Sequence, residues 1–319
     1  MSKPTILITG GTGFLGRNLA LALRDDSDVV LGARNHQQIS AAETATGCTV
    51  LPLDVVNIES VRDVHAEVRP DIVIHAAATK FVDLAERLPL ECIDVNVVGS
   101  QNVARVAIEK NVKIVLGIST DKAAPPVRNT YGLSKALMER LFCSMNGKTD
   151  TRFGCVRFGN VAWSTGSVFP IWKKMHGDTG VIHSTGPEMR RFFFSVGEAV
   201  RLVRTAIDHF DLTEGKVLSR QMKAAQLGDI LDLWIKHKGG RWERTEGRPG
   251  ERVDEFLIGE QELPYTRRLV LDGLQHFLIA FNEKSTEPPA VALSSANAER
   301  LSNAEMLELI NGASVLWAA

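Results

Sequence analysis

The sequence predicts an α/β fold, in which a doubly wound parallel sheet is followed by a smaller mixed α/β domain. Short apolar runs alternate with segments of helical periodicity up to about residue 162, which is typical of a parallel sheet covered by helices on both faces. A glycine-rich turn joins the first apolar run to the first helical segment, and beyond residue 162 the alternation stops.

The expected elements follow one another along a first domain that we place at residues 1–162. Strands are expected in apolar, largely β-branched runs at 5–9, 29–31, 50–53, 71–77, 112–118 and 153–158. Helices are expected where apolar residues recur at helical spacing, at 17–24, 37–45, 58–68, 91–109 and 131–144.

Residues 163–319 form the expected smaller domain, which would be discontinuous and would cover the carboxyl edge of the sheet. Glycines, prolines and aromatic residues crowd residues 163–195, which indicates irregular structure. A helix expected at 197–209 would return to pack on the first domain. Residues 259–319 contain no motif that we can interpret.

The composition excludes several functions. The chain has 319 residues, 44% of them hydrophobic, and a formal net charge of −1, so no overall field would attract a nucleic acid or an anionic membrane. The four cysteines lie far apart and the histidines are scattered, which favours free thiols in a reducing compartment over disulfides or a metal site. No apolar stretch approaches the ~18 residues of a membrane span, so we expect a cytoplasmic protein.

The glycine-rich turn predicts a dinucleotide site of the Rossmann type. Gly11, Gly13 and Gly16 satisfy G-x-G-x-x-G between a strand and a helix. Glycines allow the tight turn and let backbone amides approach a pyrophosphate at the positive end of the helix. The residues expected to contact the cofactor here are Gly10, Thr12, Gly13, Phe14, Leu15 and Gly16.

The end of the second strand favours NADP over NAD. An NAD site usually carries an acid there, whereas this chain has Arg34 and Asn35. An arginine suits the 2′-phosphate of NADP; the alternative is a solvated surface residue. Asp54 and Val55, after the third strand, are placed at the adenine, although Asp54 also fits a strand-end cap.

The fourth strand ends in small residues that would let a cofactor lie against the backbone. These residues are Ala76, Ala77 and Ala78, and Lys80 follows them. Lys80 then points into the cleft or is a surface lysine, and the spacing leaves both alternatives open.

Four side chains that can transfer protons lie close together in the sequence after the fifth strand: Asp121, Lys122, Tyr131 and Lys135. Open α/β sheets bind their ligands at the carboxyl ends of the strands, which is where Asp121 and Lys122 lie. Tyr131 and Lys135 are four residues apart on a helix and share a face, and a neighbouring ammonium lowers the pKa of a phenol. A phenol of this kind removes a hydroxyl proton near neutral pH, so the stretch predicts an enzyme.

Loops near or after the end of the first domain carry arginines, among them Arg157, Arg190, Arg191 and Arg248. Guanidinium groups bind phosphates through paired hydrogen bonds, so these loops suggest a diphosphate ligand. Each arginine taken alone would more often be an exposed loop residue.

These residues resemble the nucleotide-sugar branch of the extended short-chain dehydrogenase/reductases, which share the glycine turn and the Tyr131-x-x-x-Lys135 pair. More narrowly, Ser-Thr-Asp-Lys at 119–122 and Arg-Pro-Gly-Glu at 248–251 resemble the polysaccharide-biosynthesis group typified by the inverting UDP-N-acetylglucosamine 4,6-dehydratases. The resemblance covers about residues 5–258.

The resemblance implies a redox-neutral cycle on UDP-N-acetylglucosamine with bound NADP. Tyr131 would take the proton of the 4-hydroxyl while a hydride leaves C4, and Lys135 would hold the cofactor ribose. Lys122 would remove the C5 proton and Asp121 would protonate the departing 6-hydroxyl. A hydride returned to C6 would complete a 4-keto-6-deoxy sugar. Thr120 belongs to the same catalytic set.

The resemblance also implies the remaining contacts. Asn96 joins the cofactor-binding set, and Phe81 stands where the group usually has histidine. At least a dimer is expected, formed through the helices at 91–109 and 131–144. The residues expected to bind the UDP-sugar are Lys80, Asn160, Ser167, Val168, Arg191, Arg248 and Glu251.

Two alternatives stay open. A UDP-sugar epimerase acting at C4 or C5 needs the same tyrosine, lysine and NADP but keeps the 6-hydroxyl; Asp121 and Lys122 favour chemistry at C5. A sensor or scaffold that binds NADP without turnover is the other alternative. Such proteins commonly lack the Tyr131–Lys135 pair.

Overall fold

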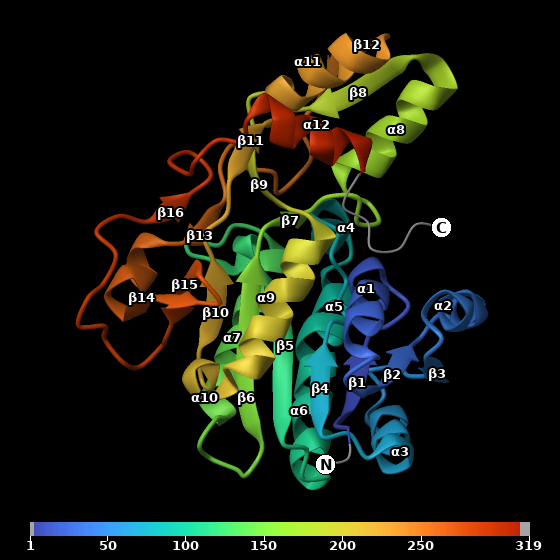
Figure 1. Cartoon of the computed structure of the whole chain (residues 1–319), viewed down its shortest axis with the longest axis vertical. Helices are drawn as coiled ribbons and strands as arrows, with labels where there is room; N and C mark the ends of the chain where they lie inside the picture. The colour runs from blue at the N-terminus through green and yellow to red at the C-terminus, as the bar shows by residue number, and fades with distance from the viewer. Residues whose placement is uncertain (1–2, 313–319) are drawn as a thin grey trace.

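The central feature of the protein is a nine-stranded sheet, shown in a computed structural model that describes residues 3–312 (Figure 1). Its strands are β1 (Thr5–Thr9), β2 (Asp28–Ala33), β3 (Thr49–Pro52), β4 (Ile72–His75), β5 (Ile114–Thr120), β6 (Arg152–Phe158), β10 (Val217–Arg220), β14 (Thr266–Leu271) and β15 (Leu274–Ile279). Their order is β14-β15-β10-β6-β5-β4-β1-β2-β3. Every neighbouring pair from β10 to β3 is parallel, and β15 and β14 are added antiparallel at one edge.

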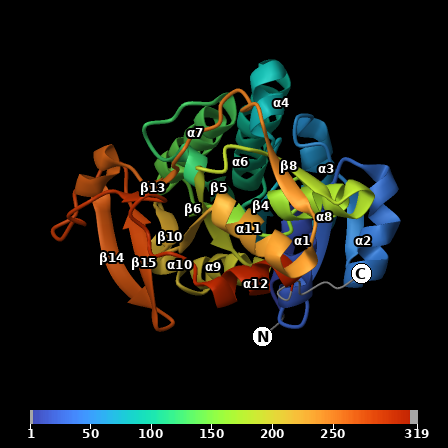
Figure 2. The same ribbon diagram turned by 90° about the horizontal axis from the view of Figure 1, so that it is seen from above.

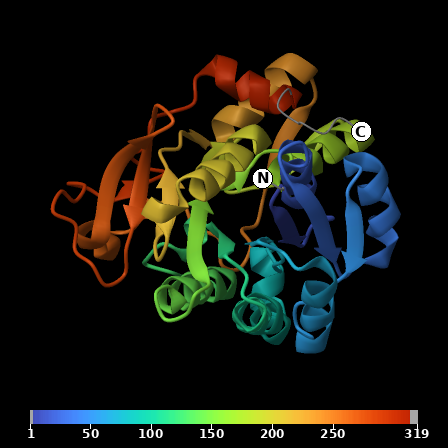
Figure 3. The ribbon, with the colours of Figure 1, turned by 60° about the horizontal axis from the view of Figure 1, so that its bottom comes forward.

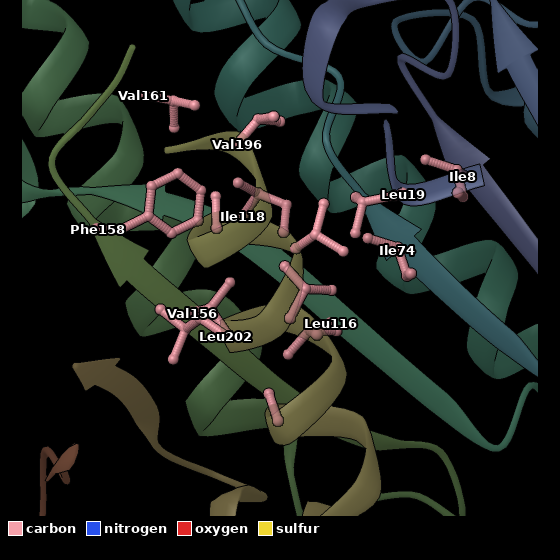
Figure 4. Close-up of a cluster of buried hydrophobic side chains, with 14 of the residues drawn as sticks. Ile8, Leu19, Ile74, Leu116, Ile118, Val156, Phe158, Val161, Val196 and Leu202 are labelled. Carbon is pink, nitrogen blue, oxygen red and sulfur yellow. The ribbon is translucent and has the colours of Figure 1, made fainter. Parts of the chain in front are cut away.

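Helices cover both faces of this sheet, which confirms the predicted doubly wound α/β class (Figures 2 and 3). One face carries α3 (Ile58–Val68), α6 (Gly99–Glu109) and α7 (Thr130–Met145), and the other carries α1 (Phe14–Leu23), α2 (Ile39–Thr46) and α9 (Val196–Asp208). Side chains of β5 alternate between the two layers: Val115 packs with the first, and Leu116 and Ile118 with the second. Figure 4 shows Ile118 and Leu116 near Leu202 of α9. Burial on both faces explains the continuous apolar run of this strand.

The helix expected at 91–109 is a continuous helical run with a π-helical turn inside it. The run consists of α5 (Pro89–Ile93), the π-helical turn at Asp94–Val98, and α6. Within the π-helical turn, Asn96 accepts a hydrogen bond from the backbone N of Thr79 at 2.8 Å and donates to Thr79 O and to Ser134 Oγ at 2.9 Å each. The widened turn therefore aims an amide at the loop after β4, in keeping with the frequent occurrence of such bulges at functional sites.

A smaller body lies at the carboxyl ends of the parallel strands, at the top of Figure 1. Its elements are β7 (Asn160–Val161), α8 (Val168–Thr179), β8 (Val181–Thr185), β9 (Arg190–Phe194), β11 (Ala224–Gln226), α11 (Leu227–Lys238), β12 (Arg241–Thr245) and α12 (Asn303–Asn311). Its own apolar core includes Phe169, Trp172 and Trp234. Shorter elements complete the structure: α4 (Val82–Arg87), α10 (Phe210–Thr213), β13 (Phe256–Ile258) and β16 (Leu293–Ser294).

The nine-stranded sheet takes β10, β14 and β15 from the segment that we expected to form the second domain. α9 from the same segment packs against α1. Within residues 3–312, no helix has the length and apolar character that crossing a membrane requires.

Candidate active site

A cavity of about 480 Å³ lies along the carboxyl ends of the parallel strands. The turn after β1 forms one wall. Gly10 has φ of 69°, and a Cβ added to it would lie 2.8 Å from the backbone of Ala77, so this position requires glycine. The helix α1 starts directly after Gly13, which as the N-cap makes no side-chain cap hydrogen bond. Its first amides are therefore available to an anionic group.

Most residues expected to bind the cofactor line this cavity: Gly10, Thr12, Gly13, Phe14, Leu15, Gly16, Arg34, Asn35, Ala76, Ala77, Ala78, Lys80, Tyr131 and Lys135. Three expected residues do not. The carboxylate of Asp54 accepts a hydrogen bond from Val56 N at 3.0 Å, as a cap would. Val55 is buried in the apolar core, and Asn96 supports the loop after β4 from behind.

The helix α7 brings Tyr131 and Lys135 next to the end of β5. Its N-cap Asn129 accepts a hydrogen bond from Gly132 N at 2.7 Å. A Cβ added to Gly132 would lie 2.2 Å from the backbone oxygen of Lys122. The glycine thus allows α7 to approach the 3₁₀ turn at Asp121–Ala123 closely, and it places the two halves of the predicted catalytic set around one cavity.

The expectation that Lys135 lowers the pKa of Tyr131 is wrong for the described structure. Burial raises the pKa of Tyr131, and a hydrogen bond with Thr120 opposes the shift only in part. Lys135 is itself buried, its Nζ donates to Met138 Sδ at 3.1 Å, and burial lowers its pKa to about 8. Desolvation is the largest cause of both shifts, and Lys135 is not among the groups that shift the pKa of Tyr131.

Lys122 borders the cavity and contacts two buried acids. Its Nζ lies 3.0 Å from Oδ1 of Asp121, 3.4 Å from Oδ1 of Asn160 and 4.0 Å from Oε1 of Glu255. Thr120 also lines the cavity, and its hydroxyl donates to Asp121 Oδ1 at 3.0 Å. Asp121 is fully buried behind Lys122. The arrangement can exchange a proton between an amine at the cavity surface and acids beneath it.

A second cavity of about 170 Å³ continues from the first into the smaller body. Asn160, Gly166 and Ser167 line both cavities. Gly166 has φ of 78°, and a Cβ added to it would lie 2.1 Å from Cε1 of Phe81. The residues expected to bind the UDP-sugar that line the second cavity are Asn160, Ser167, Val168, Arg191, Arg248 and Glu251.

Two of the four named arginines face this second cavity. The guanidinium of Arg191 is held by the backbone oxygens of Arg252 at 2.7 Å and Val253 at 3.1 Å. The exposed Arg248 begins a turn to Glu251, and its backbone N donates a hydrogen bond to Glu251 Oε2 at 2.8 Å. Together these two arginines place positive charge at the cavity wall.

The other two arginines are not placed to bind a phosphate. Arg157 is fully buried and forms ion pairs with Glu139 and Glu262. Arg190 forms an ion pair with Asp254. The suggestion that Arg157 belongs to a diphosphate site is therefore corrected: two acids already occupy its guanidinium.

Several residues at the site were not assigned from the sequence. Among them, Gln38 lines the first cavity, His183 lines the second, and Glu255 contacts Lys122. None of these three lies in a spacing pattern that indicates chemistry. Only their positions in the folded chain bring them to the site.

Comparison with known proteins identifies the family of the chain. A family model described as "Polysaccharide biosynthesis protein" matches residues 6–269. A UDP-N-acetylglucosamine 4,6-dehydratase (inverting) from Campylobacter jejuni is 32% identical, covering 82% of this chain and 79% of the relative. A UDP-glucose 4-epimerase from Rickettsia bellii is 36% identical, covering 96% and 95%. The X-ray structure of Pen from Bacillus thuringiensis is 27% identical with a TM-score of 0.89 over 99% of both chains. The predicted resemblance is confirmed.

Proposed function

The chain belongs to the polysaccharide biosynthesis protein family, and we propose that it is an NADP-dependent 4,6-dehydratase acting on UDP-N-acetylglucosamine. The observation that carries the proposal is the position of Lys122. Its amine borders the first cavity and lies 3.4 Å from Asn160, which lines both cavities. A base at this junction suits proton removal from a sugar carbon next to the cofactor.

The residues of the first cavity fit a dinucleotide. The glycine turn leaves room for a pyrophosphate against the backbone, and the first amides of α1 face it. Arg34 is exposed beside the end of β2 and lines the cavity, which supports a 2′-phosphate and hence NADP. When bound, the nicotinamide would accept the hydride from C4 and return it to C6; its ring would be positively charged before the first transfer and after the second, and neutral between them.

The residues of the chain move the protons of the reaction. Tyr131 takes the proton of the 4-hydroxyl once its phenol is ionised, a state that burial opposes and that the hydrogen bond with Thr120 favours. The ketone at C4 acidifies C5–H, and Lys122 removes that proton. Asp121, bonded to Lys122 at 3.0 Å, supplies a proton to the departing 6-hydroxyl. When C6 has regained a hydride, Lys122 returns a proton, exchanged with solvent, to C5. Lys135 and Tyr131 line the cofactor side of the cavity.

The test is proton NMR of the purified protein incubated in D₂O with UDP-N-acetylglucosamine and catalytic NADP. We expect a new C6 methyl signal and deuterium at C5, since elimination and proton exchange occur in one cycle. No change in the sugar, with this substrate and with other UDP-hexoses, would contradict the proposal and favour the non-catalytic alternative.

A UDP-sugar epimerase remains the second candidate, because the relative from Rickettsia bellii carries that name at 36% identity. The same NMR experiment separates the two functions. Deuterium at C5 with the 6-hydroxyl retained would assign a C5 epimerase. A changed C4 configuration without deuterium at C5 would assign a C4 epimerase.

We also propose that the protein is a cytoplasmic homodimer. The four cysteines are free and buried, as expected in a reducing compartment. The helices α5 and α7 contact each other and expose Leu90, Leu133 and Leu137 at 76%, 57% and 53%, an apolar face that suits a second copy. Sedimentation should show a dimer that the double substitution Leu133→Glu, Leu137→Glu converts to a monomer. A wild-type monomer at micromolar concentration would contradict this.

A further inference from the structure

Glu255 is a buried acid that the proposed reaction leaves without a role. Its side chain is 3% exposed, and its Oε1 lies 4.0 Å from Nζ of Lys122. Its Oε2 has no hydrogen-bond partner within residues 3–312, although Nη1 of Arg252 lies 3.9 Å away. A buried carboxyl group with an unsatisfied oxygen opposes folding, so its position calls for an explanation in function.

Hydrogen bonds from distant segments hold Glu255 in this place. Glu255 N donates to Ser295 Oγ at 3.0 Å, and Ser295 N donates to Glu255 O at 2.8 Å. Arg252 donates to Pro126 O at 2.9 Å, which ties the same segment to the loop that follows Lys122. The part of the chain without an interpretable motif thus supplies, through Ser295, an anchor for an acid at the site.

Lys122 therefore lies between two buried acids. Its Nζ is 3.0 Å from Asp121 and 4.0 Å from Glu255, and Oδ2 of Asp121 also lacks a hydrogen-bond partner within the described residues. The charged groups that face Glu255 are Lys122, Asp121, Arg191 and Arg252. Burial raises the pKa of Glu255; the three cations oppose this shift and Asp121 adds to it. The carboxylate accepts a proton more readily than an exposed glutamate does.

We propose that Glu255 is a positioning residue that holds Lys122 between two acids and accepts the proton that the amine must lose before it acts as a base. The inference rests on the proposed function. The proton passes from the ammonium of Lys122 to the carboxylate of Glu255, which leaves a neutral amine and a neutral acid. The amine then takes the C5 proton as the bond between C6 and its hydroxyl breaks. The departing hydroxyl takes one proton from the cluster and leaves as water, so the cluster returns to its starting charge.

The first test compares Glu255→Gln with wild type over a range of pH. At neutral pH we expect kcat and C5 deuterium exchange to fall roughly 10- to 100-fold, with KM and NADP affinity nearly unchanged. The deficit should shrink as the pH rises, because solvent then takes the proton that Glu255 no longer accepts. Glu214→Gln is the matched control: this acid pairs with Arg152 away from both cavities, and its loss should leave kcat within about twofold of wild type.

Three results of this test would overturn the inference. They are an unchanged kcat in Glu255→Gln, a deficit of the same size at every pH, and an equal deficit in Glu214→Gln. A loss of kcat that does not depend on pH would mean that Glu255 only supports the fold around Lys122. Absence of turnover in the wild-type protein would instead contradict the proposed function. A second measurement would then decide the inference about Glu255.

The second measurement requires no turnover. In protein labelled with ¹³C at the glutamate carboxyl carbon, the signal missing from Glu255→Gln belongs to Glu255. We expect this signal to titrate at higher pH in Lys122→Met, because the substitution removes a nearby cation that favours the carboxylate. An unchanged titration would overturn the inference, because it would mean that the ammonium of Lys122 has no electrostatic effect on the carboxyl group of Glu255.

Discussion

Two buried clusters of this protein each combine one cation with two acids, but they differ in how completely their polar atoms are paired. Around Arg157, Nε and Nη2 donate to Glu139 at 2.9 and 2.6 Å, and Nη1 and Nη2 donate to Glu262 at 2.8 Å each. Around Lys122, one bond of 3.0 Å to Asp121 is joined by a longer contact to Glu255. One oxygen of each acid in this second cluster has no hydrogen-bond partner within residues 3–312.

This difference distinguishes a structural ion cluster from a reactive one. Burial alone would lower the pKa of Arg157, but the charges of Glu139 and Glu262 raise it, so the guanidinium stays charged. It joins β6 to α7 and to the 3₁₀ helix Glu260–Tyr265. Lys122 borders a cavity, and its acids retain oxygens that can take a proton. Full pairing fixes the charges of a buried cluster, whereas incomplete pairing lets a proton move.

The largest expected effect comes from removing the cation of the reactive cluster. Lys122→Met should lower kcat by roughly 10²- to 10⁴-fold, because the base for C5 is lost. NADP binding and the midpoint of thermal unfolding should change little. The exposed Lys113, paired with Asp71, provides the control: Lys113→Met should retain turnover. Full activity of Lys122→Met would contradict the conclusion that the Lys122 cluster is reactive and the Arg157 cluster structural.

Removing the cation of the structural cluster should affect the fold instead. Arg157→Met leaves Glu139 and Glu262 buried without a counter-charge, which should cost about 3–5 kcal/mol of unfolding free energy. Urea denaturation measures the loss. Arg152, whose pairs with Asp211 and Glu214 lie at the surface, is the matched control, and Arg152→Met should cost only about 0–1 kcal/mol. Equal losses in the two variants would contradict this reasoning.

A third cation, Arg34, lines the cavity in an exposed position at the end of β2. Arg34→Ala should weaken NADP binding on the order of 10- to 100-fold, since charge-assisted hydrogen bonds contribute about 1.5–3 kcal/mol. The affinity for NAD should change little, and fluorescence titration with the two cofactors measures both. Equal losses for NADP and NAD would place Arg34 away from the 2′-phosphate.

A fourth cation, Lys135, is buried, and its amine contacts the sulfur of Met138. Burial lowers its pKa to about 8, while an unfolded lysine titrates near ~10.4. Between these values the unfolded chain binds a proton that the folded chain does not, so this group makes stability rise with pH. Unfolding free energies of wild type relative to Lys135→Met, measured from about pH 8 to about pH 10, should rise accordingly. A constant difference would contradict the lowered pKa.

Much of the first domain is predictable from sequence, because each element carries its own periodic signal. The helix expected at 58–68 is found at Ile58–Val68. The glycine turn is recognisable because its backbone conformation at Gly10 requires glycine. Asp121, Lys122 and Tyr131 were also recognisable, since they lie close together in the chain.

The rest of the site depends on tertiary structure. Glu255 and His183 reach their places through packing of segments that have no periodic or spacing signal of their own. The direction of the Tyr131 pKa shift was wrong because the degree of burial cannot be read from the four-residue spacing to Lys135. Arg157 was misassigned for the same reason: its partner Glu262 comes from a distant segment.

The contact between Gly166 and Phe81 restricts the order in which this cavity can change during evolution or engineering. Any side chain at position 166 would overlap the Phe81 ring. Even with space available, the φ of 78° disfavours any residue other than glycine at this position. A smaller residue at position 81 must therefore come first, after which only a residue that tolerates this backbone conformation can follow at 166. The two positions are epistatic, and the wall shared by the two cavities changes by paired substitutions rather than single ones.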